Sequence, residues 1–495
     1  MTTEGRGAAE QAAEHAADHA EGSSAAVAAM LAGAAALGGF LFGYDSSVIN
    51  GTVDALRQQF HLNSFWIGFV VSSALLGCAV GAWFAGPLAD RIGRIKVMVG
   101  AAVIFVISSL GSALAFSAAD LTFWRVVGGI AIGTASVIAP AYIAEIAPAN
   151  LRGRLGSLQQ MAIVLGIFAA LVVNYVIARM SDGGATGTFP WGGSSWRWMF
   201  GVAMLPAVLY GVVSLVIPES PRYLVKKGEI RRAKQILQRL AGHEADVDVK
   251  IGRILRSLAT DRPVHLRDLR GERFGLLPIV WIGILLSVFQ QFVGINVIFY
   301  YGTTLWHAAG FGENDAMLTS VINSMVNVGS TLIAIALVDK VGRRPLLLFG
   351  AGLMAVTLCV MAVCFATAPV VDGNPKLGHV AGPVALVAAN LYVFGFASTW
   401  GPIVWVMLGE MFNNFIRASA LAVAAAAQWI ANWLITVTFP WLSGMSLGLA
   451  YGLYTAFAAL AFVFVWRSVP ETKGRELEDM DKLRGPEHRR QPSAT

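Results

Sequence analysis

Twelve long apolar runs divide this chain, and they limit its possible folds more than any other feature of the sequence. Each run has about the 20 residues that an α-helix needs to cross the hydrocarbon core of a bilayer. Only 13% of the residues are charged and 56% are hydrophobic, which excludes a string of soluble domains. The expected spans are 25–53, 64–87, 97–118, 121–146, 154–178, 196–217, 275–303, 316–338, 345–368, 381–409, 416–440 and 446–467. The sequence therefore predicts an all-α membrane protein with twelve transmembrane helices.

The basic residues fall almost entirely in alternate loops and in the two ends of the chain. Cytoplasmic loops carry the excess of Lys and Arg in membrane proteins, so both termini are predicted to be cytoplasmic. The net charge of +6 is then explained by orientation and by contact with lipid, and no nucleic-acid partner is expected. The five exceptions among the 36 basic residues are Arg57, Arg125, Arg179, Arg197 and Lys376.

Three pairs of motifs recur in the same order in the two halves of the chain. GPLADRIGRIK follows the second span and VDKVGRRP the eighth, and PESPR follows the sixth span and PETKG the twelfth. Spans four and ten each end in a glutamate seven residues before an arginine. This duplication predicts two six-helix bundles in the same orientation. The expected parts are a cytoplasmic tail (1–24), a first bundle (25–217), a cytoplasmic helical linker (218–274), a second bundle (275–469) and a cytoplasmic tail (470–495).

The sequence QQFVGINVIFYY at 290–301 places three amides and two tyrosines inside an apolar span. Such side chains are costly in hydrocarbon unless they find partners, so they should face protein or a wet cavity. On a regular helix Gln291 and Asn296 would point about 140° apart, but Gly294 between them permits a break of the kind that forms binding sites. Uncharged amides and phenols suit a neutral ligand rich in hydroxyl groups. A polar seam that joins two helices is the alternative.

Other polar residues also lie at membrane depth. Gly401–Pro402 predicts a kink in the tenth span beside Trp405. Asp45 and Arg125 are unlike charges in different spans, and each is the natural partner of the other. The remaining amides of this kind, with the tryptophan that neighbours one of them, are Gln160, Asn327, Gln428, Trp429 and Asn432.

No pattern of residues points to catalysis or to a bound metal or cofactor. Cys78, Cys359 and Cys364 lie in apolar spans without metal or redox spacing, and we expect them to be packing residues. No nucleophile or base is arranged for chemistry at membrane depth, so an enzyme is not expected.

In their order, these motifs resemble the sugar porters of the major facilitator superfamily, specifically bacterial sugar/proton symporters related to the human glucose facilitators. The resemblance covers about residues 30 to 480 and rests on FGYDSSVING, GPLADRIGRIK, RVVGG, PAYIAEIAPANLRGR, PESPR, QQFVGIN, VDKVGRRP, GPIVWVMLGEMF and PETKG. It implies the major facilitator fold. The sugar ligands that it implies are Gln160, Gln290, Gln291, Asn296, Asn327, Trp405, Gln428 and Trp429.

The resemblance also implies that Asp45 is the proton site and Arg125 its partner. Facilitators of this family typically have a neutral residue at the position of Asp45, so the aspartate favours symport. Ile167 stands where the bacterial xylose symporter has a second glutamine, as it does in the glucose facilitators, which favours glucose as the substrate.

We therefore expect proton-coupled import of a monosaccharide, most simply D-glucose, by a monomer in the cell membrane. Protonation of Asp45 would weaken its pair with Arg125, and Tyr300 and Tyr301 would close over the sugar. The alternatives are an uncoupled uniporter, a symporter for xylose or another hexose, and a sugar sensor; the last usually needs a long cytoplasmic extension. The charged residues expected to make and break contacts at the cytoplasmic face are Asp90, Arg94, Glu145, Arg152, Asp339, Arg343, Glu410 and Arg417.

Overall fold

The computed structural model describes residues 3–146, 152–241, 244–260, 269–271, 275–371, 374–412 and 416–473. Within these residues, twelve helical stretches are long and apolar enough to cross a membrane, from Ala26–Gly51 to Leu447–Ser468. The predicted all-α class and the number of spans are therefore confirmed. Strand structure in the described part is limited to β1 (Val370–Val371) and β2 (Asn374–Pro375), which pair antiparallel in one loop.

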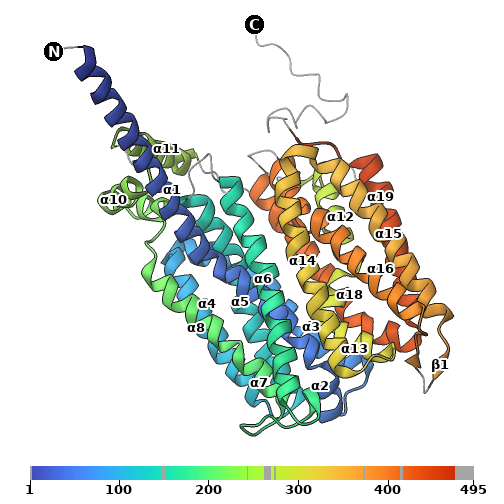
Figure 1. Ribbon diagram of the computed structural model, residues 1–495. Coiled ribbons are helices and arrows are strands. Elements are labelled where there is room, and N and C mark those ends of the chain that lie inside the picture. The colour runs from blue at the N-terminus through green and yellow to red at the C-terminus, as the bar shows by residue number, and fades with distance from the viewer. Residues whose placement is uncertain are drawn as a thin grey trace.

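The two halves of the chain form two bundles that lie side by side (Figure 1). The elements of the first are α1 (Thr3–Val48), η1 (Ile49–Gly51), α2 (Val53–Gln59), α3 (Ser64–Ile92), α4 (Arg94–Leu114), α5 (Ala118–Ile146), α6 (Arg152–Met180), η2 (Gly184–Thr186), α7 (Ser195–Val202) and α8 (Met204–Val216). Those of the second are α12 (Pro278–Phe292), α13 (Ile295–Ala308), α14 (Glu313–Val341), α15 (Arg343–Thr367), α16 (Ala381–Gly395), the π-helical turn η4 (Phe396–Trp400), α17 (Gly401–Met411), α18 (Arg417–Met445) and α19 (Leu447–Ser468).

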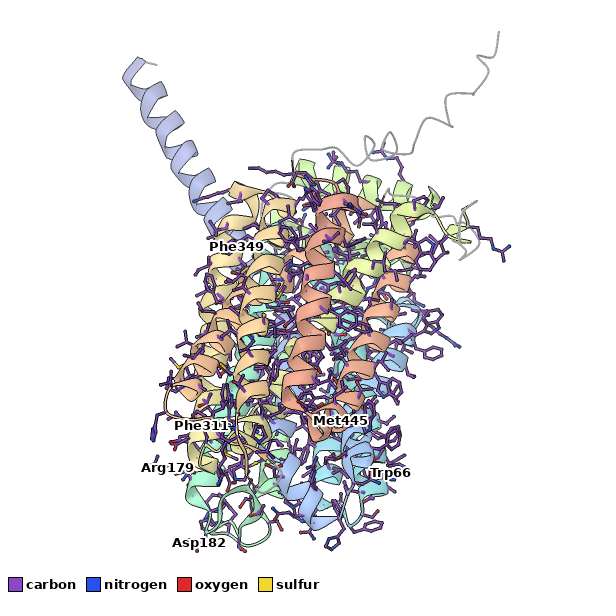
Figure 2. The ribbon with its side chains drawn as sticks, turned by 90° about the vertical axis from the view of Figure 1, so that its right-hand side faces the viewer. Trp66, Arg179, Asp182, Phe311, Phe349 and Met445 are labelled. Atoms are coloured by element: carbon purple, nitrogen blue, oxygen red, sulfur yellow. The ribbon has the colours of Figure 1, made fainter. Side chains whose placement is uncertain are left out.

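The described part of the predicted linker contains three helices, α9 (Pro221–Lys226), α10 (Ile230–Ala241) and α11 (Glu244–Thr260). α10 contacts α1, and α9 contacts α5. α10 and α11 lie at the end of the molecule where α1 begins, whereas α2, α7 and β1 lie at the opposite end (Figure 1). We call that opposite end the distal face. Trp66, Arg179, Asp182 and Phe311 lie toward it, and Phe349 lies toward the other end (Figure 2).

Glycines set how closely the helices of the first bundle approach one another. A Cβ on Gly129 of α5 would lie 2.0 Å from the carbonyl oxygen of Ala74, and one on Gly133 would lie 2.1 Å from that of Cys78. α1 approaches α6 in the same way, because a Cβ on Gly43 would lie 1.9 Å from the Ile163 carbonyl oxygen. The absence of a side chain at these glycines lets the backbone of α5 approach that of α3, and the backbone of α1 approach that of α6, as small residues do in membrane helices.

The seventh span is interrupted at Gly294, as its sequence predicts, and the tenth span contains a π-helical turn directly before Gly401–Pro402, where a kink is predicted. α12 ends at Phe292 and α13 begins at Ile295, with Gly294 between them at φ +86°, a conformation that favours glycine. In the tenth span the π-helical turn ends at Trp400, directly before Gly401 and Pro402. Pro402 has no N–H group to donate to a carbonyl of the preceding turn.

Cys78 and Cys364 are buried, in agreement with a packing role, but Cys359 is exposed. The prediction for Cys359 is therefore wrong: it lies on an outward-facing side of α15, where hydrophobicity alone does not separate surface from interior in a membrane span.

Candidate functional site

Asp45 of α1 and Arg125 of α5 form an ion pair inside the first bundle, as their unlike charges predict. Nη1 of Arg125 donates to Oδ1 of Asp45 at 2.8 Å, and the two side chains are 3% and 13% exposed, respectively. The Arg125 guanidinium also lies 5.7 Å from the centre of the Phe200 ring. A pair so little exposed loses much hydration, and removing either partner leaves the other charge uncompensated.

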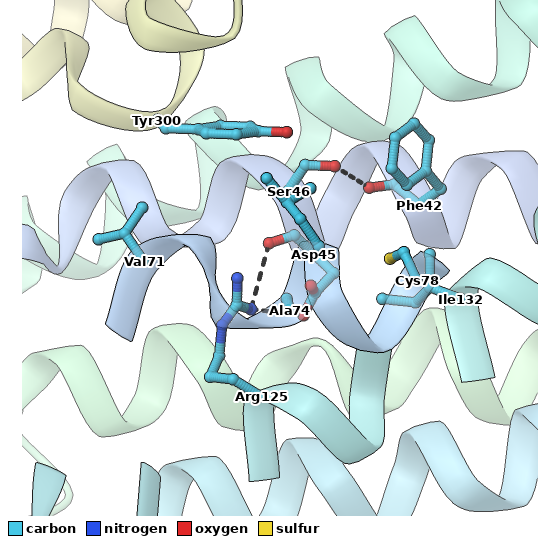
Figure 3. A pocket seen from close by; sticks show the side chains of 10 residues that line it. Phe42, Asp45, Ser46, Val71, Ala74, Cys78, Arg125, Ile132 and Tyr300 are labelled. Atoms are coloured by element: carbon cyan, nitrogen blue, oxygen red, sulfur yellow. Dashed lines mark hydrogen bonds and ion pairs between the residues drawn. The ribbon is translucent and has the colours of Figure 1, made fainter. Parts of the chain in front are cut away.

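A small cavity adjoins this pair at the junction of the two bundles. Its lining includes Phe42, Asp45, Ser46 and Arg125 from the first bundle and Tyr300 from α13 of the second. In Figure 3, Asp45 lies between Tyr300 and Arg125. Phe42 also packs edge-on against Trp429 of α18, with 5.5 Å between ring centres. The ion pair of one bundle is therefore close to aromatic side chains of the other.

Four of the predicted ligands form one hydrogen-bonded amide network in the second bundle. Asn296 Nδ2 donates to Gln291 Oε1 at 2.6 Å and to Asn432 Oδ1 at 2.9 Å. Gln290 Oε1 accepts from Gln428 Nε2 at 2.8 Å and from Gln291 Nε2 at 3.3 Å. On an unbroken helix Gln291 and Asn296 would diverge, so the break at Gly294 is what brings them together.

The interrupted tenth span holds this network in place. Gln290 Nε2 donates to the carbonyl oxygens of Trp400 and Gly401, at 2.8 and 3.1 Å, where the π-helical turn meets α17. Both donors and the acceptor of Gln290 are thus engaged. Gln428 Oε1, by contrast, is buried without a partner among the described residues. Asn432 was noted in the sequence only as an amide at depth, and the structure makes it part of the network.

The other predicted ligands are not bonded into the network by any contact that the structure describes. Gln160 is half-buried on α6, Asn327 is 6% exposed on α14, and Trp405 is 43% exposed on α17. The two tyrosines diverge, since Tyr301 donates to the Thr436 carbonyl at 3.0 Å and Tyr300 faces the cavity beside Asp45. Among the described residues, no group of three or more His, Cys, Asp or Glu could hold a metal ion.

The repeated motifs GPLADRIGRIK and VDKVGRRP fold into two charge clusters with matching geometry. In the first bundle, Arg94 bonds to Glu145 at 2.9 and 3.1 Å and to Asp90 at 3.0 Å. In the second, Arg343 bonds to Glu410 at 2.8 and 3.1 Å. Each of these bonds joins helices of one bundle. The side chains of Arg152, Asp339 and Arg417 lie outside the described residues.

Sequence reasoning missed one further acidic residue in each cluster. Glu219 of PESPR accepts from the backbone N–H groups of Arg94 and Ile95, at 3.0 and 3.2 Å. Glu471 of PETKG accepts from those of Arg343 and Arg344, both at 3.0 Å. The recurrence of Pro-Glu in both motifs was the available signal.

Glu471 has a pKa below its ordinary value. Burial raises the pKa of this carboxyl, but hydrogen bonds from four backbone N–H groups lower it further than burial raises it. The donors are Lys473, Arg343, Arg344 and Thr472.

Polar bonds join the two bundles at the distal face, and the sequence did not predict them. Asn50 Nδ2 donates to the Phe299 carbonyl at 2.9 Å, and Asn50 Oδ1 accepts from the Thr303 N–H at 3.1 Å. Thr304 Oγ1 donates to Asp54 Oδ1 at 3.1 Å. Farther along, Glu313 Oε1 accepts from the Ala185 N–H at 2.8 Å. The distal face is therefore closed in this structure.

Comparison with known proteins places these features in a family. The sugar (and other) transporter family matches residues 31–483. A glucose transport protein from Synechocystis sp. is 56% identical over 91% of this chain and 96% of its own length. The D-xylose-proton symporter of Escherichia coli K12 is 38% identical over 93% of this chain and 96% of its own length.

Solved structures agree with the sequence comparison. The partially occluded inward-open conformation of the xylose transporter XylE from E. coli superposes with a TM-score of 0.76 at 35% identity, over 89% of this chain and 99% of that chain. Another structure of XylE, described as a major facilitator superfamily proton:xylose symporter bound to 6-bromo-6-deoxy-D-glucose, gives a TM-score of 0.75 at 37% identity, over 92% of this chain and 98% of that chain. The chain therefore belongs to the sugar transporter family and has the major facilitator fold.

Proposed function

We propose that this protein imports a monosaccharide together with a proton by alternating access, as a monomer in the cell membrane with both termini cytoplasmic. The observation that carries the proposal is the buried Asp45–Arg125 pair, which borders a cavity completed by Tyr300 of the other bundle. A titratable pair at this junction can bias the arrangement of the two bundles when it gains a proton. The relatives named as proton symporters for D-xylose and arabinose support the coupling.

The sugar site in this proposal is the amide network with its neighbouring aromatic rings. An amide that is already bonded to other amides can exchange those bonds for bonds to sugar hydroxyls and remain satisfied. Trp405 and Trp429 would offer apolar faces to the C–H face of a sugar ring. The proposed ligands are Gln160, Gln290, Gln291, Asn296, Asn327, Trp405, Gln428 and Trp429.

D-glucose is the proposed substrate, ahead of xylose and other hexoses. It is supported by the 56% identity with the glucose transport protein from Synechocystis and by the aliphatic Ile167 on α6. A hydrophobic side chain at this position cannot hydrogen-bond to a sugar hydroxyl, so polar contacts with the sugar would come from the amides of the second bundle.

The proton acts through Asp45 in this mechanism. While Asp45 is ionised, its attraction to Arg125 stabilises one arrangement of α1 and α5. Protonation removes one of the two charges, and the bundles are then free to rearrange around Tyr300. Coupling requires only that proton and sugar favour the same arrangement. The closed distal face and the 43% exposure of Trp405 support a state in which the sugar site opens toward the cytoplasm.

The cytoplasmic clusters act as braces within each bundle in this proposal. Since the bonds of Arg94 and of Arg343 each stay within one bundle, they hold the helix ends that must meet when the cytoplasmic face closes. Arg152, Asp339 and Arg417 belong to the same proposed gating set through their places in the repeated motifs.

Uptake of radiolabelled glucose into proteoliposomes tests the proposal. With an inward proton gradient we expect accumulation above equilibrium that a protonophore abolishes, and competition by xylose, galactose and fructose ranks the substrates. Rapid equilibration that ignores the gradient would instead show a uniporter, and Asp45–Arg125 would then be a structural pair.

A further inference from the structure

Two carboxylates take part in the bonds that close the distal face. Asp54 of α2 accepts from Thr304 of α13, and Glu313 of α14 accepts from the backbone at Ala185 in η2. Glu313 also lines an open cleft between the two bundles, so water from the distal side reaches it. The third contact, through Asn50, is uncharged and has both donor and acceptor satisfied. Among the contacts described across this face, the carboxylates and the groups beside them are therefore the ones that can respond to pH.

Asp54 occupies a poor environment for a negative charge when the distal face is closed. Its side chain is half-buried, and its hydrogen bond across the bundles comes from a neutral hydroxyl. The charged or titratable groups that face it are Arg57 on its own helix and His307, an exposed residue, on α13. Burial raises the pKa of Asp54 above its ordinary value, although the Thr304 bond, Arg57 and His307 each lower it.

We propose that Asp54 is a second proton-binding site of this protein and that its protonation holds the distal face closed. A neutral Asp54 keeps a hydrogen bond with Thr304 without the loss of hydration that an ionised carboxylate suffers. When α13 moves away, water returns to the carboxylate and its charge is again favoured. The inference rests on the proposed function only in that the distal face must open during transport.

The sign of the effect follows from linkage between proton binding and conformation. Because the pKa of Asp54 is raised in the closed state, that state binds the proton more tightly, so lower pH favours closure. The stabilisation is lost as pH rises through the closed-state pKa. Each unit by which the pKa differs between the closed and open states changes their ratio about tenfold. Asp54 lies at the distal face in both states, so its proton returns to the distal side and is not carried across.

Distances across the distal face test this proposal directly. Gln59 of α2 and Asn314 of α14 are exposed and belong to different bundles, and they can be replaced by cysteine for spin labels after Cys359→Ser. Pulsed electron–electron double resonance then measures the distance between the two labels in the full-length protein, at pH 8 and pH 5 without sugar. The distance distribution gives the fraction of protein with a closed distal face. Measuring in the Asp45→Asn background removes the Asp45 carboxylate, the proposed coupling site, from the titration.

We expect the ratio of closed to open protein to be severalfold higher at pH 5 than at pH 8. Asp54→Asn should show the higher, pH 5 ratio at both pH values. Glu313→Gln is the matched control, since it removes a carboxylate from the same interface: it should lower closure at both pH values and keep the pH response. A pH response that survives Asp54→Asn overturns the proposal, as does one that His307→Gln abolishes. If glucose and pH leave the distances unchanged in every variant, including those with Asp45 intact, alternating access itself fails.

Discussion

Replacement of Asp45 by asparagine tests the proposed coupling and allows its size to be worked out. One carboxylate carries one proton, and a pH difference of one unit corresponds to about 1.4 kcal/mol per proton. With the membrane potential held at zero, a carrier that moves one proton with each sugar therefore concentrates glucose about tenfold per pH unit. Asparagine does not ionise in this range, so Asp45→Asn should bring the internal and external concentrations only to equality.

The exchange of labelled for unlabelled glucose should persist in this variant, because exchange needs the sugar site and the motion of the bundles but no net proton movement. Loss of one partner of a buried ion pair destabilises by about 3–5 kcal/mol, so we also expect a lower melting temperature. Arg125, 3% exposed, is the charge left without its partner. Retained exchange shows that the variant is folded.

Asp120→Asn is a matched control for the loss of one negative charge from the first bundle. Asp120, in the first turn of α5, accepts from the Phe116 N–H at 3.2 Å, and the Oδ1 of an asparagine can accept the same bond. This variant should still accumulate glucose about tenfold per pH unit. An Asp45→Asn protein that concentrates glucose to the same extent would refute the assignment of Asp45. Accumulation of glucose by about a hundredfold per pH unit in the unmodified protein would refute the transport of a single proton with each sugar.

Three further predictions concern the amide network, the packing of α1 and the charge cluster around Arg343. Gln290→Ala should raise KM for glucose about 10- to 100-fold in uptake assays, because orphaned buried polar groups cost about 1–3 kcal/mol each; Ser287→Ala, one turn earlier, should leave KM unchanged. Gly43→Ala should lower the melting temperature and transport together, since its Cβ would lie 1.9 Å from a carbonyl of α6, whereas Gly33→Ala, which meets open space, should do neither. Glu471→Gln should lower the melting temperature at pH 7; the difference should shrink as pH falls below the ordinary value of 4.5 and vanish below the lowered pKa of the folded protein, because a lowered pKa stabilises only while the carboxyl is ionised. A difference that persists in acid would contradict this reasoning.

Local sequence was sufficient for the elements of the fold and for some features of the site. The interruption at Gly294 was predicted, but the π-helical turn before Pro402 was not, since the sequence predicted only a kink there. The Asp45–Arg125 pair was also predicted, because two unlike charges embedded in apolar spans have few other ways to be satisfied. These inferences need only the residue types and their depth in the membrane.

Other features of the site depend on the path of the chain. Asn296 points toward Gln291 and Asn432 because of the orientation of α13 relative to α12. The spacing of residues along a single helix does not predict that orientation. The same holds for Tyr300 and Tyr301, neighbours in sequence that contact different partners. Cys359 likewise lies outward, although it shares the apolar helix α15 with the buried Cys364.

The sequence by itself determined the membrane class, the twelve spans and the duplicated halves, because transfer of a segment into lipid depends on the sum of its own side chains. Only the tertiary structure decided which residues meet across the two bundles. Asn50 with Thr303, Asp54 with Thr304 and Glu313 with Ala185 are each more than a hundred residues apart in the chain. Such contacts depend on how whole bundles pack, and in lipid that packing is set by close backbone approach and hydrogen bonds rather than by hydrophobicity.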